Sequence, residues 1–286
     1  MKILYSLLPF LLIVSCAVSE KEIFNPSYEP EVSVFGVIGN DPAYEFVIVE
    51  RTLTLNEDYE DSTVQKSLII RNARVLIASR DDTVEFHFWE DPSITSPDHP
   101  DFVMARGVYL DTENALSVKS DQTYALTVIL DDGRCVTGET TIPKAPVIFD
   151  PSPSDTLNVS EICDKYIRWI GSSTTFAYLP QFLITTAYNI EMIGRPYQFN
   201  ILSEINVLDE WVSLEPVYSF FKVENTSLFL PSATIKIIAM DQNMYDFTAK
   251  SGLADMVGQS LNLLEGGIGV FGSMSADSLC VRLAFE

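Results

Sequence analysis

The sequence is poor in basic residues, histidine and cysteine. Its 286 residues include 18 Lys or Arg against 40 Asp or Glu, with only two His and four Cys. The formal net charge of −22 argues against nucleic acid and anionic lipid as partners, because those surfaces repel an acidic protein. Two His and four Cys are too few for a Cys/His zinc framework, so we expect no metal and no cofactor.

Long hydrophobic runs are also scarce. Residues 3–14 form a nearly unbroken apolar run, but at about twelve residues it is too short to cross a bilayer, which takes roughly twenty. The run follows Lys2 and is typical of the hydrophobic region of a signal peptide. No later segment reaches about 18 apolar residues, so the sequence predicts no transmembrane helix.

The apolar run ends in Leu-Ile-Val-Ser-Cys at residues 12–16. This pattern resembles the bacterial lipobox, with an aliphatic residue three before the cysteine and a small residue just before it. The resemblance implies that residues 1–15 are a signal peptide and that Cys16 carries the lipid on its sulfur and its new amine. Several acyl chains anchor a protein stably, whereas one holds it only marginally. An ordinary secretory peptide that contains Cys16 is the alternative.

The residues after Cys16 bear on the location. Ala17, rather than Asp, follows the cysteine, which by the bacterial sorting rule implies passage to the outer membrane. Residues 19–22, Ser-Glu-Lys-Glu, loosely resemble the surface-export signal of Bacteroidetes lipoproteins, although a solvated tether explains them equally well. We therefore expect residues 16–30 to form a lipidated tether that holds the chain on the outer membrane, with both the periplasmic side and the cell surface left open.

From residue 31 to residue 145 the chain is typical of an all-β domain. Short apolar runs separated by turn signals recur every 8 to 12 residues, without a sustained helical period. They predict an immunoglobulin-like or transthyretin-like β-sandwich, with Asp131-Asp132-Gly133 as a hairpin turn. The predicted strands are residues 32–38, 44–49, 67–70, 73–77, 84–89, 107–110, 123–130 and 135–142.

A second β-sandwich, fibronectin-like, is predicted for residues 146–286. Four prolines within residues 143–153 would end the first sheet and form a semi-rigid linker between the domains. Asp241 is expected to cap one short helix over residues 242–250, with Gly252 as its C-terminal stop. The predicted strands of this domain are residues 166–170, 182–188, 228–239, 266–271 and 279–285.

Four short segments carry a family resemblance. They are Val-Phe-Gly-Val-Ile at residues 34–38, Thr-Thr-Ile-Pro at 140–143, Ala-Met-Asp-Gln-Asn-Met-Tyr at 239–245, and the Gly-rich residues 264–272. Together with the lipobox they resemble the Bacteroidetes lipoproteins that carry domain of unknown function 4249. The resemblance implies an outer-membrane location, often beside TonB-dependent transporters. It implies no catalytic residues.

Several patterns could indicate chemistry. Residues 267–272 match G-x-G-x-x-G, but only fourteen residues follow them, too few for a dinucleotide-binding unit; a tight backbone passage is the better interpretation. Residues 96–101 contain two carboxylates and His99, and residues 56–61 form an acidic run that could offer oxygens to calcium. For residues 96–101 the favoured interpretation is a solvated loop, and for residues 56–61 it is a charged connection between strands. His87 alternates with Phe86 and Phe88 and is expected to face away from them.

The remaining candidates are tryptophans and cysteines. Trp169 is expected to fill the second core, whereas Trp89 and Trp211 lie beside acidic residues and could form a surface platform that stacks on sugar rings. Cys135, Cys163 and Cys280 can form at most one intramolecular pair, and isolated thiols buried in strands are favoured over a disulfide.

Two functions fit this sequence. The first is a non-enzymatic lipoprotein that binds a ligand or assists a TonB-dependent transporter, and the second is a structural or adhesive envelope spacer. An enzyme is not expected, because there is no Gly-x-Ser-x-Gly elbow and only two His could act as a base. The sequence leaves open one enzymatic alternative, glycoside hydrolysis, which needs only two carboxylates that the fold brings together.

Overall fold

The structure is a computed structural model. It describes residues 29–41, 44–54, 57–58, 61–90, 107–189, 196–200, 210–224, 229–257 and 263–285. The elements of these residues are β1 (Val32–Gly39), β2 (Phe46–Arg51), α2 (Ser62–Leu68), β3 (Arg74–Ala78), β4 (Thr83–Trp89), β5 (Val108–Leu110), β6 (Thr123–Ile129), β7 (Cys135–Thr141), β8 (Val147–Asp150), β9 (Thr156–Asn158), the 3-10 helix η3 (Val159–Asp164), β10 (Tyr166–Ile170), β11 (Ala177–Asn189), β12 (Pro196–Asn200), β13 (Trp211–Ser213), α4 (Glu215–Val223), β14 (Phe229–Met240), α5 (Gln242–Val257) and β15 (Ile268–Ala284). None of the helices in this described part has the length and apolar character to span a bilayer.

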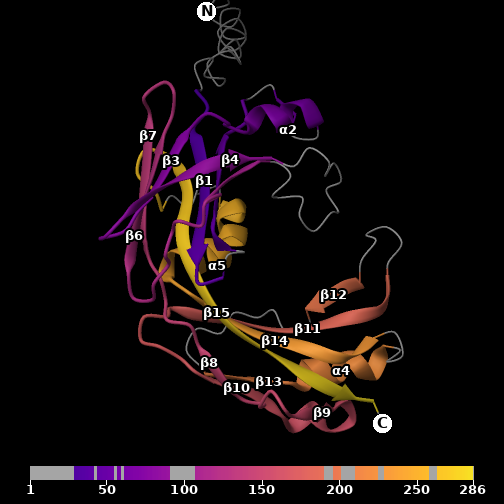
Figure 1. Cartoon of the computed structure of the whole chain (residues 1–286). Helices are drawn as coiled ribbons and strands as arrows, with labels where there is room; N and C mark the ends of the chain where they lie inside the picture. Colours follow the sequence, from indigo (N-terminus) through magenta and orange to yellow (C-terminus); the bar gives the residue numbers. More distant parts are fainter. Residues whose placement is uncertain are drawn as a thin grey trace, which may run out of the picture.

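One large sheet runs through the whole described molecule. Its strand order is β12-β11-β14-β15-β1-β2-β5-β4-β3-β6-β7, and β9 also pairs with β15. The long strand β15 joins the two halves: residues 268–274 pair in parallel with β1, and residues 274–282 pair antiparallel with β14. We call β1–β7 with the start of β15 the first lobe, and β8–β14 with the end of β15 the second lobe (Figure 1).

The sheet of the first lobe curls back on itself. Thr137 in β7 exchanges two backbone hydrogen bonds of 2.9 Å with Glu265, just before β15 begins. The core inside this curl takes alternate residues of each strand, including Val75, Phe86 and Leu126. Leu264 and Phe271 join that core from the far end of the chain, so the first lobe is completed only by residues that follow the second.

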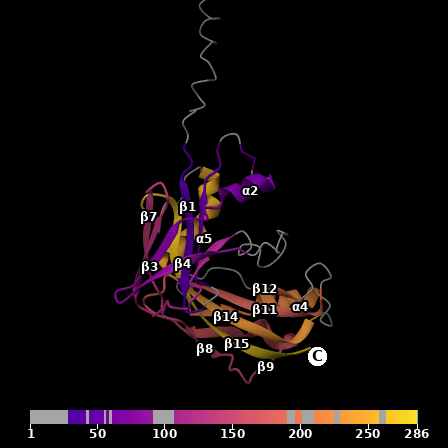
Figure 2. The ribbon, with the colours of Figure 1, turned by 45° about the horizontal axis from the view of Figure 1, so that its top comes forward.

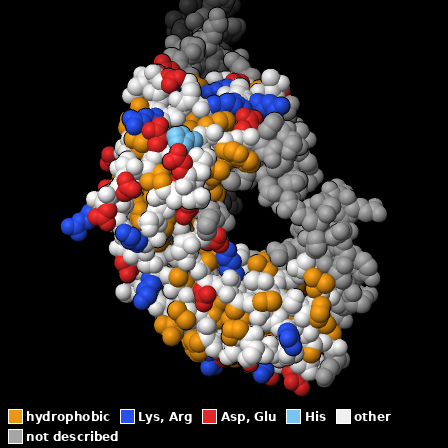
Figure 3. All heavy atoms as spheres, viewed as in Figure 1, with side chains coloured by type: hydrophobic (Ala, Val, Ile, Leu, Met, Phe, Trp, Pro, Cys, Tyr) orange, Lys and Arg blue, Asp and Glu red, His pale blue; other side chains and the backbone are white. Residues whose placement is uncertain are grey.

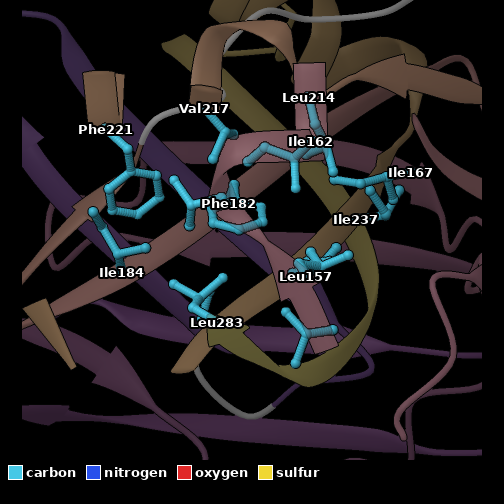
Figure 4. Packing of buried hydrophobic residues seen from close by; sticks show 14 of the residues in the cluster. Leu157, Ile162, Ile167, Phe182, Ile184, Leu214, Val217, Phe221, Ile237 and Leu283 are labelled. Carbon is cyan, nitrogen blue, oxygen red and sulfur yellow. The ribbon is translucent and has the colours of Figure 1, made fainter. Parts of the chain in front are cut away.

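The second lobe is a two-layer sandwich. The strands β12, β11, β14 and the end of β15 form one layer, and the three-stranded sheet β13-β10-β8 forms the other. Figure 4 shows the core between the layers, where Phe182 and Ile237 of the large sheet meet Ile167 of β10 and Val217 and Phe221 of α4. The helices η3 and α4 complete this core at one end of the lobe.

The helix α5 lies where the two lobes meet. It packs beside β1 and β15 in both ribbon views (Figures 1 and 2), and its Phe247 ring lies 5.3 Å from the Phe35 ring of β1. Met244 of α5 belongs to a third apolar cluster with Val37 of β1 and Ile238 of β14. This cluster packs side chains of both lobes together. The lobes are therefore held by apolar contacts as well as by the continuous strand β15.

The predicted all-β sandwich class is confirmed. The immunoglobulin-like or fibronectin-like topology and the division at residues 145 and 146 stay predictions. One predicted strand, residues 67–70, is wrong. The Asp61 carboxylate accepts a 2.7 Å hydrogen bond from the Thr63 backbone N–H and caps helix α2, which takes up Ser67 and Leu68. A side-chain cap therefore outweighs the β-branched residues that follow it.

The second half contains more helix than the sequence predicts. The single short helix expected over residues 242–250 continues through Gly252 to Val257, and α4 and η3 are additional helices. The two predicted strands at 266–271 and 279–285 are one strand, β15, because it finds a partner on each side of Met274. The expected proline linker contains β8, where the Ile148 backbone N–H donates a 2.9 Å hydrogen bond to the Asp277 carboxylate of β15.

Candidate functional site

Some predicted site residues cannot be placed. The lipidation candidate Cys16 and the loop at residues 96–101, with His99, lie outside the described residues. His87 is described: it lies on the exposed side of β4 while Phe86 points into the core, as the alternation predicted. Within the described residues, no three His, Cys, Asp or Glu side chains lie close enough to hold a metal ion.

The acidic run at residues 56–61 is described only in part. Glu57 receives two hydrogen bonds of 2.6 Å from the Arg51 guanidinium and one of 2.8 Å from the Thr54 backbone N–H. Asp61 caps α2. Both carboxylates therefore already serve structural roles, which supports the interpretation of this run as a charged connection.

The Glu57 carboxylate gives a pH-dependent prediction. The hydrogen bond from Arg51, followed by that from Thr54, lowers the pKa of Glu57 to about 2. A lowered pKa means that this contact stabilises the fold above the ordinary Glu pKa and is lost as the pH falls through about 2. We expect a carboxyl ¹³C titration of Glu57 with its midpoint near that value. In Arg51→Ala the midpoint should return towards an ordinary Glu; an unchanged midpoint would contradict the assignment.

The three cysteines of the described residues, Cys135, Cys163 and Cys280, are unpaired. Cys135 and Cys280 are exposed and Cys163 is half-buried, and none of them forms a disulfide. The expectation of isolated thiols is therefore confirmed, but the expected burial is wrong. Cys135 and Cys280 occupy the solvent-facing positions of β7 and β15, because their neighbours Val136 and Val281 point into the two cores.

The Gly-rich segment before and within β15 is a close backbone passage, as predicted. Gly269 has a φ of +118°, and a Cβ added there would overlap the carbonyl oxygen of Val34 in the paired strand β1. A Cβ on Gly267 would similarly meet the Val32 carbonyl. No helix follows; the residues continue as strand β15, which agrees with the rejection of a dinucleotide site.

The three tryptophans have different environments. Trp169 is 1% exposed in the core of the second lobe, as predicted. Trp89 in β4 and Trp211 in β13 are both at the surface, also as predicted. They belong to different lobes, so they do not form one platform; Trp211 instead packs edge-to-face against Tyr166, with ring centroids 5.2 Å apart.

Around Trp211 the outer face of the three-stranded sheet is apolar. We define this outer face as Val147, Phe149, Tyr166, Arg168, Ile170 and Trp211. Val147, Phe149 and Ile170 are each more than half exposed. An antiparallel sheet that faces water on one side normally alternates apolar and polar residues, but β10 carries Tyr166 and Ile170 outward while Ile167 and Trp169 point inward. Figure 3 shows hydrophobic side chains at the surface over β8 and β10.

A polar cavity of about 470 Å³ lies at the joint between the lobes. It is formed by the end of β7, the turn at residues 173–176 and the first residues of α5. Its lining provides hydroxyl, amide and carboxyl groups, and no His, Lys, Arg or Cys. Such a lining can hydrogen-bond a small polar ligand.

A buried hydrogen-bond network forms one wall of this cavity. Asp241, Thr140 and Ser273 are all less than 9% exposed. Thr140 Oγ1 lies 2.5 Å from Asp241 Oδ2 and 2.9 Å from Ser273 Oγ. Burial raises the pKa of Asp241, against the hydrogen bonds from Thr140 and from the backbone N–H groups of Met244 and Ser273, which lower it.

Sequence reasoning identified only one member of this network. Asp241 was predicted as the cap of α5, and it does accept from the Met244 N–H at 2.9 Å. Its partners lie 101 and 32 residues away in β7 and β15. The only usable sequence signal was Asp241 itself, an acidic residue directly after a strongly apolar strand.

The model of the family described as domain of unknown function DUF4249 matches residues 20–279, which is most of the sequence. None of the curated proteins compared with the chain matches it.

Proposed function

The chain belongs to the DUF4249 family, and from this premise we propose that it is a non-enzymatic cell-envelope lipoprotein that assists a TonB-dependent outer-membrane transporter. The observation that carries the proposal is the apolar outer face of the three-stranded sheet. An exposed apolar patch on a folded domain is typical of a protein interaction site. The lipobox at Cys16 and the family resemblance favour a partner in the outer membrane.

The position of the outer face suits a tethered accessory protein. The described chain enters the first lobe at residue 29, and the sheet β13-β10-β8 lies at the opposite end of the molecule (Figure 1). With the lipid on Cys16, this face belongs to the lobe that lies away from the entry of the tether. A tether of about 14 residues can reach at most roughly 50 Å, which lets the body turn this face towards a neighbouring protein.

The size of the outer face indicates the kind of contact. Its five apolar side chains are each roughly half exposed, so that each leaves on the order of 100 Å² in water and all five about 500 Å². A stable interface takes about 800 Å² from each partner. The face can therefore form the largely apolar part of an interface, and the partner must also match the charge of Arg168, which lies on the central strand β10 between Trp211 and Asp150, 4.0 Å from the Asp150 carboxylate.

Photo-crosslinking in intact cells tests the proposal. We would place benzoyl-phenylalanine at Trp211, and at Trp89 as the matched control, since the exposed fractions are 48% and 39%. We expect an adduct with a TonB-dependent transporter from position 211, little from position 89, and loss of the adduct in Cys16→Ser. Deletion of the protein should also reduce uptake of one substrate while the amount of transporter stays unchanged.

Three outcomes would contradict the proposal. Equal adducts from both positions would mean that the outer face is not a specific site. No adduct with an outer-membrane transporter would reject the accessory role. An adduct between two copies of the chain would instead support the structural spacer.

A further inference from the structure

The network at the joint connects elements from both lobes. Thr140 lies in β7 of the first lobe, Asp241 follows β14 of the second, and Ser273 lies in the shared strand β15. Asp241 Oδ1 accepts hydrogen bonds from the backbone N–H groups of Met244 at 2.9 Å and Ser273 at 3.1 Å. The other carboxyl oxygen, Oδ2, is left to face the Thr140 hydroxyl.

The hydrogen atoms of this network can be counted. Three oxygen–oxygen contacts run in a row: Asp241 Oδ2 to Thr140 Oγ1 at 2.5 Å, Thr140 Oγ1 to Ser273 Oγ at 2.9 Å, and Ser273 Oγ to the Thr141 carbonyl at 2.9 Å. Each contact needs one hydrogen. Thr140 and Ser273 supply only one hydroxyl hydrogen each. The third hydrogen must therefore belong to the Asp241 carboxyl group.

We propose that Asp241 is a neutral carboxylic acid in the folded protein, and that its proton closes the joint between the two lobes. In this form the Asp241 Oδ2–H donates to Thr140, the Thr140 hydroxyl donates to Ser273, and the Ser273 hydroxyl donates to the Thr141 carbonyl. With an ionised Asp241, Thr140 must donate to the carboxylate. Either the contact between Thr140 and Ser273 or that between Ser273 and Thr141 then has no hydrogen.

The charges around Asp241 fit this assignment. The segments packed around it, residues 135–141, 171–177, 237–249 and 268–281, contain no Lys, Arg or His; Arg134, Lys236, Lys250 and Arg282 lie directly beyond their ends, and Lys144 donates its backbone N–H to Thr174 in the turn beside the cavity. Their acidic groups are Glu139, which lines the same cavity, Asp246 on α5 and Asp277 on β15. Their other titratable groups are Tyr245, Cys135 and Cys280. Burial disfavours a negative charge on Asp241, while the N-terminus of α5 and the hydrogen bonds from the backbone N–H groups of Met244 and Ser273 favour one. Burial is the largest of the influences on the pKa of Asp241 and raises it.

The proposal fixes the sign of a pH dependence. A carboxyl group that binds its proton more tightly in the folded than in the unfolded state stabilises the fold at low pH. That contribution is lost as the pH rises from about 4, the ordinary Asp value, through the pKa in the folded protein. Between those two values the unfolding equilibrium constant gains about tenfold per pH unit from this one group.

Asp241→Asn is the matched variant. Its Nδ2–H₂ can donate to Thr140 and its Oδ1 can accept from Met244 and Ser273, so it reproduces the protonated form at every pH. We would measure urea unfolding of the full-length protein in detergent from pH 4 to pH 8. The ratio of the wild-type unfolding constant to that of Asp241→Asn should rise with pH, while Asp241→Ala and Thr140→Val should be less stable than wild type at pH 4.

The opposite charge state predicts the opposite result. If Asp241 were ionised in the fold with a lowered pKa, Asp241→Asn would be less stable than wild type, and the gap would stay nearly constant above about pH 5 and shrink only as the pH falls below about 4. A ¹³C carboxyl titration of Asp241 in the wild-type protein gives a second measurement that needs no variant to fold. A midpoint at or below the ordinary Asp value would overturn the proposal. Crosslinking at the outer face does not depend on this proton, so the two proposals can fail separately.

Discussion

Replacement of Gly269 by alanine should prevent the two lobes from forming one stable molecule. Gly269 lies where β15 pairs with β1, and its φ of +118° belongs to a region that L-residues with a side chain rarely adopt. The added methyl group would also overlap the Val34 carbonyl, which is fixed in β1. We expect a loss of more than about 4 kcal/mol in unfolding free energy, seen as loss of soluble protein or of a cooperative melting transition.

Gly133→Ala is the control for this experiment. Gly133 also has a positive φ, +88°, but a Cβ added there would meet nothing within 4 Å. Its substitution should cost about 1–2 kcal/mol, the backbone penalty alone. If both variants lose the same stability, the close approach between β15 and β1 does not limit the fold.

Trp169→Ala should be the most damaging truncation in the second lobe. Its side chain is buried between the layers, 5.4 Å from the Tyr178 ring in an edge-to-face arrangement. Removal of a large buried aromatic side chain leaves a cavity and costs about 3–5 kcal/mol. For a protein of this size we expect a fall in melting temperature on the order of 10 °C, measured by circular dichroism.

Trp211→Ala provides the matched control. Trp211 is 48% exposed, so its loss should change the unfolding free energy by no more than about 1 kcal/mol. Trp169→Phe should cost less than Trp169→Ala, because it keeps an aromatic ring and removes a buried indole N–H that has no hydrogen-bond partner. Equal melting temperatures for Trp169→Ala and Trp211→Ala would contradict the assigned core.

Patterns within a few consecutive residues predicted those strands whose burial and pairing depend on neighbouring residues in the chain. The alternation in residues 84–89 placed Phe86 inside and His87 outside, and the Asp-Gly turn predicted the β6–β7 hairpin, in which Gly133 has φ +88°. Trp169 was correctly assigned to a core because apolar residues flank it on the same strand. The strand predicted at residues 67–70 failed because Asp61, outside that window, starts a helix.

The sequence by itself determined the β-rich class, most of the strands of the first lobe and the net negative charge, since each depends on composition or on residues adjacent in the chain. Only the tertiary structure decided that β15 is one strand shared by both lobes, because its partners β1 and β14 are separated by about 190 residues. The same holds for the proton at Asp241. Its existence follows from counting hydrogens among Thr140, Asp241 and Ser273, which meet only when the long strand brings the end of the chain back to the first lobe.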